Sequence, residues 1–256
     1  MTAVEREWRK IEKAEARLRE KAERYEVPAW KAGLEEKLPR KLTEGLERAF
    51  ARAFALLFEK GTAVIEKTYR REELEKDFQI RDYTFDVRRG RRELGQIRRN
   101  AGRSNALTAA FTTVEGVGLG LLGIGLPDVA VWLGVLLRSV YETALKYGFD
   151  YETPRERYLI LAMMEASMRT GEDWLAADRE VDNLVRTICF APTEEALKEQ
   201  TGKTSNAFAE ALLTAKFVQG LPVVGAVGGA ANPVYYRRVM GYVELKYRKR
   251  YLMEKR

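Results

Sequence analysis

The sequence contains a glycine-rich apolar stretch that restricts the folds open to the chain. It runs from Gly116 to Leu137, 22 residues with a single charged side chain. A continuous helix of that length would be ~33 Å long, enough to cross the hydrocarbon core of a bilayer. However, Pro127 and Asp128 lie in its middle, where proline breaks a helix and a carboxylate costs about 2.5–3.5 kcal/mol at the bilayer centre. The stretch is therefore predicted to form two shorter apolar elements, a buried or interfacial helical hairpin joined at Pro127.

A second stretch, from Phe217 to Tyr236, repeats these features near the C-terminus. It carries no charge over 20 residues and is interrupted by Pro222 and Pro233. Two interpretations stay open: the two hairpins form the core of an ordinary helical domain, or they contact lipid or another apolar ligand. The residues that would form such an apolar hairpin site are Gly118, Leu119, Gly120, Leu122, Gly123, Leu126, Pro127, Trp132, Pro222, Val224, Gly225, Gly228 and Gly229.

Apolar residues recur at helical spacing in the rest of the chain, which predicts an all-α fold. We expect a compact multi-helix domain over residues 28–256, preceded within residues 1–27 by a charged amphipathic helix that could bind a protein partner. Residues 77–90 alternate briefly and predict an extended connection. Thr153-Pro154 and Asn232-Pro233 each indicate a helix start. Further helices are expected at 28–39, 42–58, 62–76, 172–189, 193–200 and 204–219. Gly61 is expected to end the helix that covers residues 42–58.

The chain has no histidine and a single cysteine, Cys189. It therefore cannot by itself supply Ser-His-Asp or Cys-His catalysis, a zinc site with His or paired Cys ligands, a haem-ligating His or a disulfide. Neither a metal nor a cofactor is expected, and Cys189 is expected to pack as a small hydrophobe. Because no apolar segment follows a basic start, no secretory signal is predicted and we expect a cytoplasmic location.

Basic and acidic residues are distributed unevenly along the chain. Residues 1–105 and 201–256 each carry a net charge of +7, whereas residues 106–200 carry −7. Basic clusters attract polyanions such as nucleic acid and anionic lipid headgroups, but they also form ordinary solvated helix faces. The candidate anionic-surface patch contains Arg88, Arg89, Arg91, Arg92, Arg98, Arg99, Arg103, Arg248, Lys249 and Arg250.

A smaller polar group falls within the apolar region. Arg138 and Glu142 are four residues apart on one predicted helix and therefore share a face. They could belong to a buried network that orders helices, or to a polar floor beneath an apolar pocket in which Arg138 binds a phosphate or carboxylate headgroup. The candidate headgroup contacts are Glu115, Asp128, Arg138, Glu142 and Asn232.

Two segments of the chain resemble the EcsC protein family. The first is GLGLLGIGLPDVAVWLGVLLRSVYETALKYGFD, and the second is LPVVGAVGGAAN followed by a Tyr-rich basic helix that ends in RKRYLMEK. Together they span about residues 106–254 in the order typical of the family. Glu115 departs from the pattern, because the family has glycine there. The resemblance implies the fold group rather than an activity.

These features predict a peripheral membrane-associated or lipid-binding helical protein without catalytic activity, whose partner is an anionic membrane surface or a lipid-like ligand. The inner face of the membrane is the expected place of contact. One alternative is a hydrolase-type enzyme of lipid or ester metabolism that uses carboxylates such as Glu115 and Asp128. Another alternative is nucleic-acid binding through the basic clusters, which is less expected because no known nucleic-acid motif is present.

Overall fold

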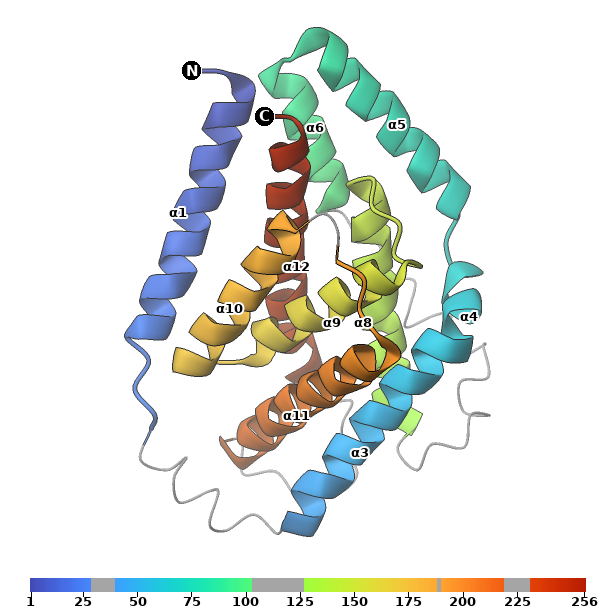
Figure 1. Ribbon diagram of the computed structural model, residues 1–256, viewed down its shortest axis with the longest axis vertical. Helices are drawn as coiled ribbons and strands as arrows, with labels where there is room; N and C mark the ends of the chain where they lie inside the picture. Colours follow the sequence, from blue (N-terminus) through green and yellow to red (C-terminus); the bar gives the residue numbers. More distant parts are fainter. Residues whose placement is uncertain (29–39, 103–126, 188–189, 219–230) are drawn as a thin grey trace.

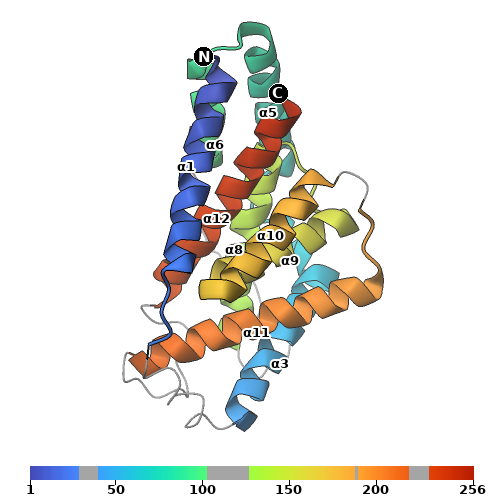
Figure 2. The same cartoon turned by 60° about the vertical axis from the view of Figure 1, so that its left-hand side comes forward.

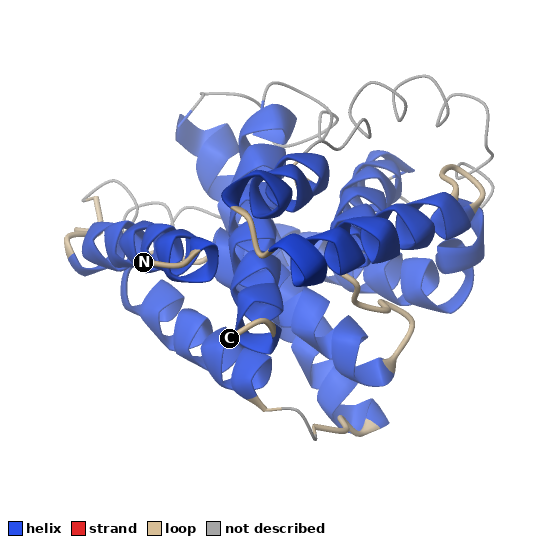
Figure 3. Cartoon of the chain, turned by 90° about the horizontal axis from the view of Figure 1, so that it is seen from above, coloured by secondary structure: helices blue, strands red, loops and turns tan. Residues whose placement is uncertain are grey.

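The computed structural model describes residues 1–28, 40–102, 127–187, 190–218 and 231–256. Within these ranges all regular secondary structure is helical, which confirms the predicted all-α fold (Figure 3). None of the described helices is both long and apolar enough to cross a membrane. The elements are α1 (Ala3–Glu23), α3 (Arg40–Leu56), the π-helical turn η1 (Leu57–Gly61), α4 (Thr62–Glu66), α5 (Arg71–Arg88), α6 (Arg91–Ala101), α8 (Pro127–Lys146), α9 (Pro154–Met168), α10 (Gly171–Arg186), α11 (Glu194–Val218) and α12 (Ala231–Glu254).

Several predictions concern residues outside these ranges. They include the glycine-rich parts of both hairpins, the helix expected at 28–39 and the environment of Cys189. The helices that follow the two glycine-rich segments, α8 and α12, are both described.

The centre of the fold is formed by α8, α9 and α12, which the other helices surround (Figure 1). Helix α9 packs against α10, α11 and α12, and α8 packs against α3, α5, α6 and α12. The central position of α9 follows from its sequence. The segment YLILAMMEASM is apolar on nearly all sides, and every residue from Tyr158 to Met168 is buried. A helix that is apolar all round is stable only when other elements cover it.

Helix α1 lies along α10 and α12 (Figure 2). It starts with a capping box, in which the Glu5 amide donates to Thr2 Oγ1 at 3.1 Å and the Thr2 amide donates to Glu5 Oε2 at 2.8 Å. Val4 and Ile11, seven residues apart, are buried against the body. The predicted amphipathic helix is therefore present, and its apolar stripe packs within the same chain.

The expected helix end at Gly61 is wrong. The chain passes from α3 through the π-helical turn η1 directly into α4, without leaving helical backbone conformation. The Thr62 hydroxyl donates to the Leu57 carbonyl at 3.2 Å across the widened turn. A Cβ at Gly61 would lie 2.8 Å from Leu57 Cδ2, so a larger residue would require the buried Leu57 side chain to shift, and Gly61 lies inside a continuous helix and not at its cap.

The extended connection expected at 77–90 is also wrong, because residues 71–88 form α5. The pattern was misleading because this helix carries apolar residues on two sides. Phe78 and Phe85, seven residues apart, pack against the body, whereas Ile80, Tyr83 and Val87 are exposed on the outer side. Two apolar faces together produce a short alternation that resembles a strand.

Two other expectations have clear outcomes. The capping interaction of Thr153 is present, with the Glu156 amide donating to Thr153 Oγ1 at 3.2 Å. The separate helices expected at 193–200 and 204–219 form the single helix α11. Gly202 lies within α11 at an exposed position, and nothing lies within 4 Å of the position that its Cβ would take.

Candidate functional site

A group of exposed arginines lies where α5 meets α6, at the top of Figure 1. Arg88 and Arg89 end α5, Gly90 caps α6, and Arg91 and Arg92 start it. All four arginines are exposed. Glu93 lies 3.6 Å from Arg88 and Asp86 lies 3.9 Å from Arg89, so these neighbours neutralise the group only in part. We call Arg88, Arg89, Arg91 and Arg92 the arginine corner.

The remaining members of the first basic cluster differ from the corner. Arg99 is exposed on α6, whereas Arg98 is half-buried and forms an ion pair with Glu7 of α1 at 3.3 Å. Arg103 lies outside the described residues. The structure therefore places five of the seven arginines at the surface.

The C-terminal part of the predicted anionic-surface patch needs correction. Lys249 is 4% exposed, because its ammonium group lies 2.8 Å from Glu15 and 2.9 Å from Asp182. Arg250 donates to Glu156 at 2.6 Å and stacks over the Phe149 ring. Arg248, the third C-terminal member of the patch, forms no ion pair within the described residues. Its Nε is buried and donates no hydrogen bond there.

The ion pairs of Lys249 belong to a larger buried network. The ammonium group of Lys246, whose side chain is 0% exposed, lies 2.8 Å from Glu15, 2.8 Å from Asp178 and 2.7 Å from Asp182. Burial disfavours the charge on Lys246, but these carboxylates raise its pKa above the usual value. Burial likewise opposes ionisation of Asp182, yet the two lysines lower its pKa. The network thus ties α1 to α10 and α12.

Two of the candidate headgroup contacts, Arg138 and Glu142, form a charged ladder with Lys146 along α8. Arg138 Nε lies 3.0 Å from Glu142 Oε1, and Lys146 Nζ lies 3.5 Å from Glu142 Oε2. All three side chains are buried, and burial lowers the pKa of Lys146. Ser139, one residue after Arg138, accepts a hydrogen bond from Tyr236 of α12 at 2.8 Å. The structure describes neither Glu115 nor the side chains of Asp128 and Asn232.

Of the predicted apolar hairpin site, Trp132 is the residue whose side chain the structure describes. Its ring packs against Phe208 of α11, with the ring centroids 5.6 Å apart. Phe50, Met168, Ala211, Leu212 and Tyr235 line the rest of a void of about 10 Å³ at this point. Such a void holds at most one water molecule, so here Trp132 is a core residue.

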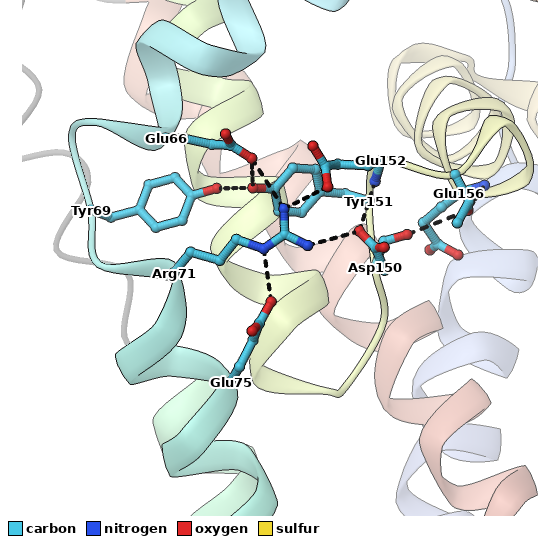
Figure 4. Close-up of polar contacts among 9 residues, drawn as sticks. Glu66, Tyr69, Arg71, Glu75, Asp150, Tyr151, Glu152 and Glu156 are labelled. Carbon is cyan, nitrogen blue, oxygen red and sulfur yellow. Dashed lines mark hydrogen bonds and ion pairs between the residues drawn. The ribbon is translucent and has the colours of Figure 1, made fainter.

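A cluster of carboxylates surrounds Arg71 at the start of α5 (Figure 4). Its guanidinium lies 2.7 Å from Glu75, 2.7 Å from Glu152, 3.2 Å from Glu66 and 3.2 Å from Asp150. These carboxylates come from α4, α5 and the α8–α9 connection, so the cluster fastens the α4–α5 edge to the centre of the fold. Asp150, which belongs to the Tyr-Gly-Phe-Asp motif, thereby has a structural role.

Tyrosines extend this cluster toward the core. The Tyr69 hydroxyl donates to the Tyr151 hydroxyl at 2.6 Å, which in turn donates to Glu66 at 2.5 Å. Tyr141 stacks on Tyr151 with ring centroids 4.1 Å apart, and burial raises the pKa of Tyr141 to about 12. Burial and the hydrogen bond to Glu66 also raise the pKa of Tyr151. These hydroxyls therefore act as neutral hydrogen-bond donors.

One feature of the site was not identified from the sequence. Ile80, Tyr83 and Val87 are 66%, 72% and 64% exposed on the outer face of α5, next to the arginine corner. Their spacing of three and four residues places them in one stripe along the helix. The spacing of Ile80, Tyr83 and Val87 in the sequence indicates an apolar stripe only if residues 80–87 are helical. The sequence predicts an extended connection there, so the stripe is not predicted.

Comparison with known proteins places the chain in a family. The profile of the EcsC protein family matches residues 4–252. The match includes α1 and the other N-terminal helices, well beyond the two segments that carry the motifs. No curated protein and no solved structure matches the chain significantly. From the extent of the family match, this chain belongs to the EcsC protein family.

Proposed function

We propose that this protein is a peripheral membrane-associated protein without catalytic activity, and that it contacts the anionic inner face of a membrane through the arginine corner. The observation that carries the proposal is the exposed apolar stripe of Ile80, Tyr83 and Val87 beside the corner. Interfacial helices combine an apolar face that enters the headgroup region with flanking basic residues. The end of α5 has this combination.

The charge of the corner supports the same function. Each arginine near an anionic membrane contributes about 1 kcal/mol of attraction, so four arginines supply at most about 4 kcal/mol, reduced by the partial neutralisation from Glu93 and Asp86. Lys249 and Arg250 make no such contribution, since ion pairs within the fold bind them. Within the predicted anionic-surface patch, the arginine corner therefore supplies most of the exposed positive charge.

The backbone at Arg89 adds a further argument. Arg89 ends α5 in the left-handed conformation, with φ 49°, where glycine is the residue that avoids strain. A side chain in this conformation costs about 1–2 kcal/mol. The Arg89 side chain is exposed at this strained position, which supports a role for its charge at the surface.

The test is flotation with liposomes of neutral and anionic composition. The variant Arg91→Gln/Arg92→Gln removes two charges from the corner, and its matched control Arg48→Gln/Arg52→Gln removes two exposed charges from α3 at the far end of the molecule (Figure 1). We expect the corner variant to lose about 30-fold in partitioning to anionic vesicles, the equivalent of about 2 kcal/mol. The control should remain within about twofold of the unaltered protein. Equal losses in both variants would refute a localised membrane contact.

A further inference from the structure

A cleft of about 800 Å³ opens between α1, the α9–α10 turn and α12. Its volume is within the range of small-molecule binding sites, about 300–1,000 Å³. Figure 2 shows the three elements side by side, with the cleft-lining half of α1 away from the arginine corner. Neither the arginine corner nor its apolar stripe contributes to this cleft.

The charged lining of the cleft is strongly basic. Glu244 is the single carboxylate among its described lining residues. The cations come from three separate parts of the chain, which the fold brings together. They are Arg17, Lys21, Arg169, Arg237, Arg238 and Arg248.

Most of these cations are not neutralised by the described part of the chain. Arg17 and Lys21 are exposed on α1 and form no ion pair there. Arg238 donates to the Arg169 backbone carbonyl at 2.6 Å, and burial lowers its pKa, as expected where no carboxylate pairs with it. Arg248 presents the buried Nε that lacks an acceptor. An anionic group bound in the cleft would lie close to these positive charges.

The walls between the cations are apolar. Trp174 and Tyr242 lie edge to face with ring centroids 6.3 Å apart, and Leu18 and Leu245 line the cleft beside them. Val234, at the start of α12, is 59% exposed at the same cleft. A bare inorganic anion would leave these apolar surfaces in contact with water.

A glycine keeps the cleft open. Gly241 lies in the interior of the 24-residue helix α12 and lines the cleft, and nothing lies within 4 Å of the position that its Cβ would take. Glycine weakens a helix interior, and here no neighbouring atom requires it. The open space in front of Gly241 therefore belongs to the cleft, and a larger side chain at this position would extend into it.

We infer that this cleft binds one amphiphile with an anionic phosphate or carboxylate headgroup and a single apolar chain. The headgroup lies among Arg17, Arg237, Arg238 and Arg248, and the apolar chain lies against Trp174 and its neighbours. The inference is independent of the proposed membrane contact, because the two sites share no residues.

Calorimetric titration of the full-length protein below the critical micelle concentration tests the inference. The probes are oleate and 1-oleoyl lysophosphatidate, with monoolein as the neutral-headed analogue and inorganic phosphate as the headgroup alone. We expect saturable one-to-one binding of at least one of the two anionic amphiphiles, and weaker binding, by about tenfold or more, of monoolein and phosphate. Absence of saturable binding of both anionic amphiphiles overturns the inference, as does binding of phosphate at equal affinity.

Two matched pairs of variants locate the binding. Gly241→Phe fills the cleft, and Gly202→Phe is its control, because Gly202 is also an exposed helical glycine with nothing near its Cβ position. Arg17→Gln/Lys21→Gln removes two cleft charges from α1, and Arg9→Gln/Lys13→Gln removes two exposed charges with the same spacing outside the cleft. We expect about a tenfold or greater loss of amphiphile affinity in each cleft variant and less than about a twofold change in each control.

The same variants separate this inference from the proposed function. Gly241→Phe should leave liposome flotation unchanged, and Arg91→Gln/Arg92→Gln should leave the titration unchanged. If Gly241→Phe and Gly202→Phe bind the amphiphile equally well, the ligand does not occupy the cleft and the inference is overturned.

Discussion

Replacement of Lys246 by methionine should destabilise the protein strongly. The Lys246 ammonium is fully buried within 2.8 Å of Glu15, Asp178 and Asp182. Methionine preserves most of the volume of the lysine side chain but removes its positive charge. Lys249 is then the one lysine of the network that faces the three carboxylates. Removal of one partner from a buried ion pair typically costs about 3–5 kcal/mol, because the remaining charges lose their compensation. We expect a decrease of that size in the free energy of unfolding.

Urea denaturation monitored by circular dichroism measures this change. Lys203→Met is the matched control, since Lys203 forms one ion pair within the described residues, with Glu199 at 3.0 Å, and the two side chains are 42% and 68% exposed. Such a pair contributes about 0.3–0.5 kcal/mol. A loss below about 1 kcal/mol for Lys246→Met would refute the conclusion that this network holds α1 to the body.

The same network predicts a dependence of stability on pH. The folded-state pKa of Asp182 is lower than its unfolded value of about 3.9, so its contribution is present above that pH and is lost as pH falls through the folded value. The folded-state pKa of Lys246 is raised, so its contribution is present below about pH 10.4 and is lost as pH rises through the folded value. Lys246→Met should flatten both limbs of the stability profile. An unchanged profile would contradict the assignment.

Three further substitutions separate stability from function. Gly148→Ala should lower the free energy of unfolding by about 2–5 kcal/mol, because φ at Gly148 is +82° and a Cβ would overlap the Phe78 ring. A decrease below about 1 kcal/mol in urea denaturation would contradict this. Arg89→Gly should raise the free energy of unfolding by about 1 kcal/mol while weakening binding to anionic vesicles by about fivefold, and weaker folding would show that the left-handed conformation is not strained. Tyr83→Ser should change stability by less than about 0.5 kcal/mol but lower vesicle partitioning several-fold, and unchanged partitioning would remove the apolar stripe from the membrane contact.

The sequence predicted features that depend on local spacing. The all-α fold, the Thr153 cap and the shared face of Arg138 and Glu142 depend on residues at most four positions apart, and the structure contains each of them. Helix α5 was missed, although it is equally local, because apolar residues on two faces obscured its period. The exposed stripe of Ile80, Tyr83 and Val87 was missed with it.

Features assembled across the chain were beyond sequence reasoning. Lys249 lies between two arginines in the sequence, which is typical of an exposed basic cluster. Its contacts with Glu15 and Asp182 show that it is buried instead. A charged side chain has the same appearance in a sequence whether water or a carboxylate solvates it. The basic cleft likewise combines Arg17 with Arg237, which lie 220 positions apart in the sequence. No periodicity connects such positions.

The most direct test of the membrane proposal is the partitioning of the unaltered protein onto vesicles, measured as a function of anionic lipid content and salt. The account predicts weak binding to neutral vesicles, a steep increase with anionic lipid content, and a decrease as salt screens the arginine corner. Partitioning that is absent at every anionic lipid content, or that is unaffected by anionic lipid and salt, would contradict the account.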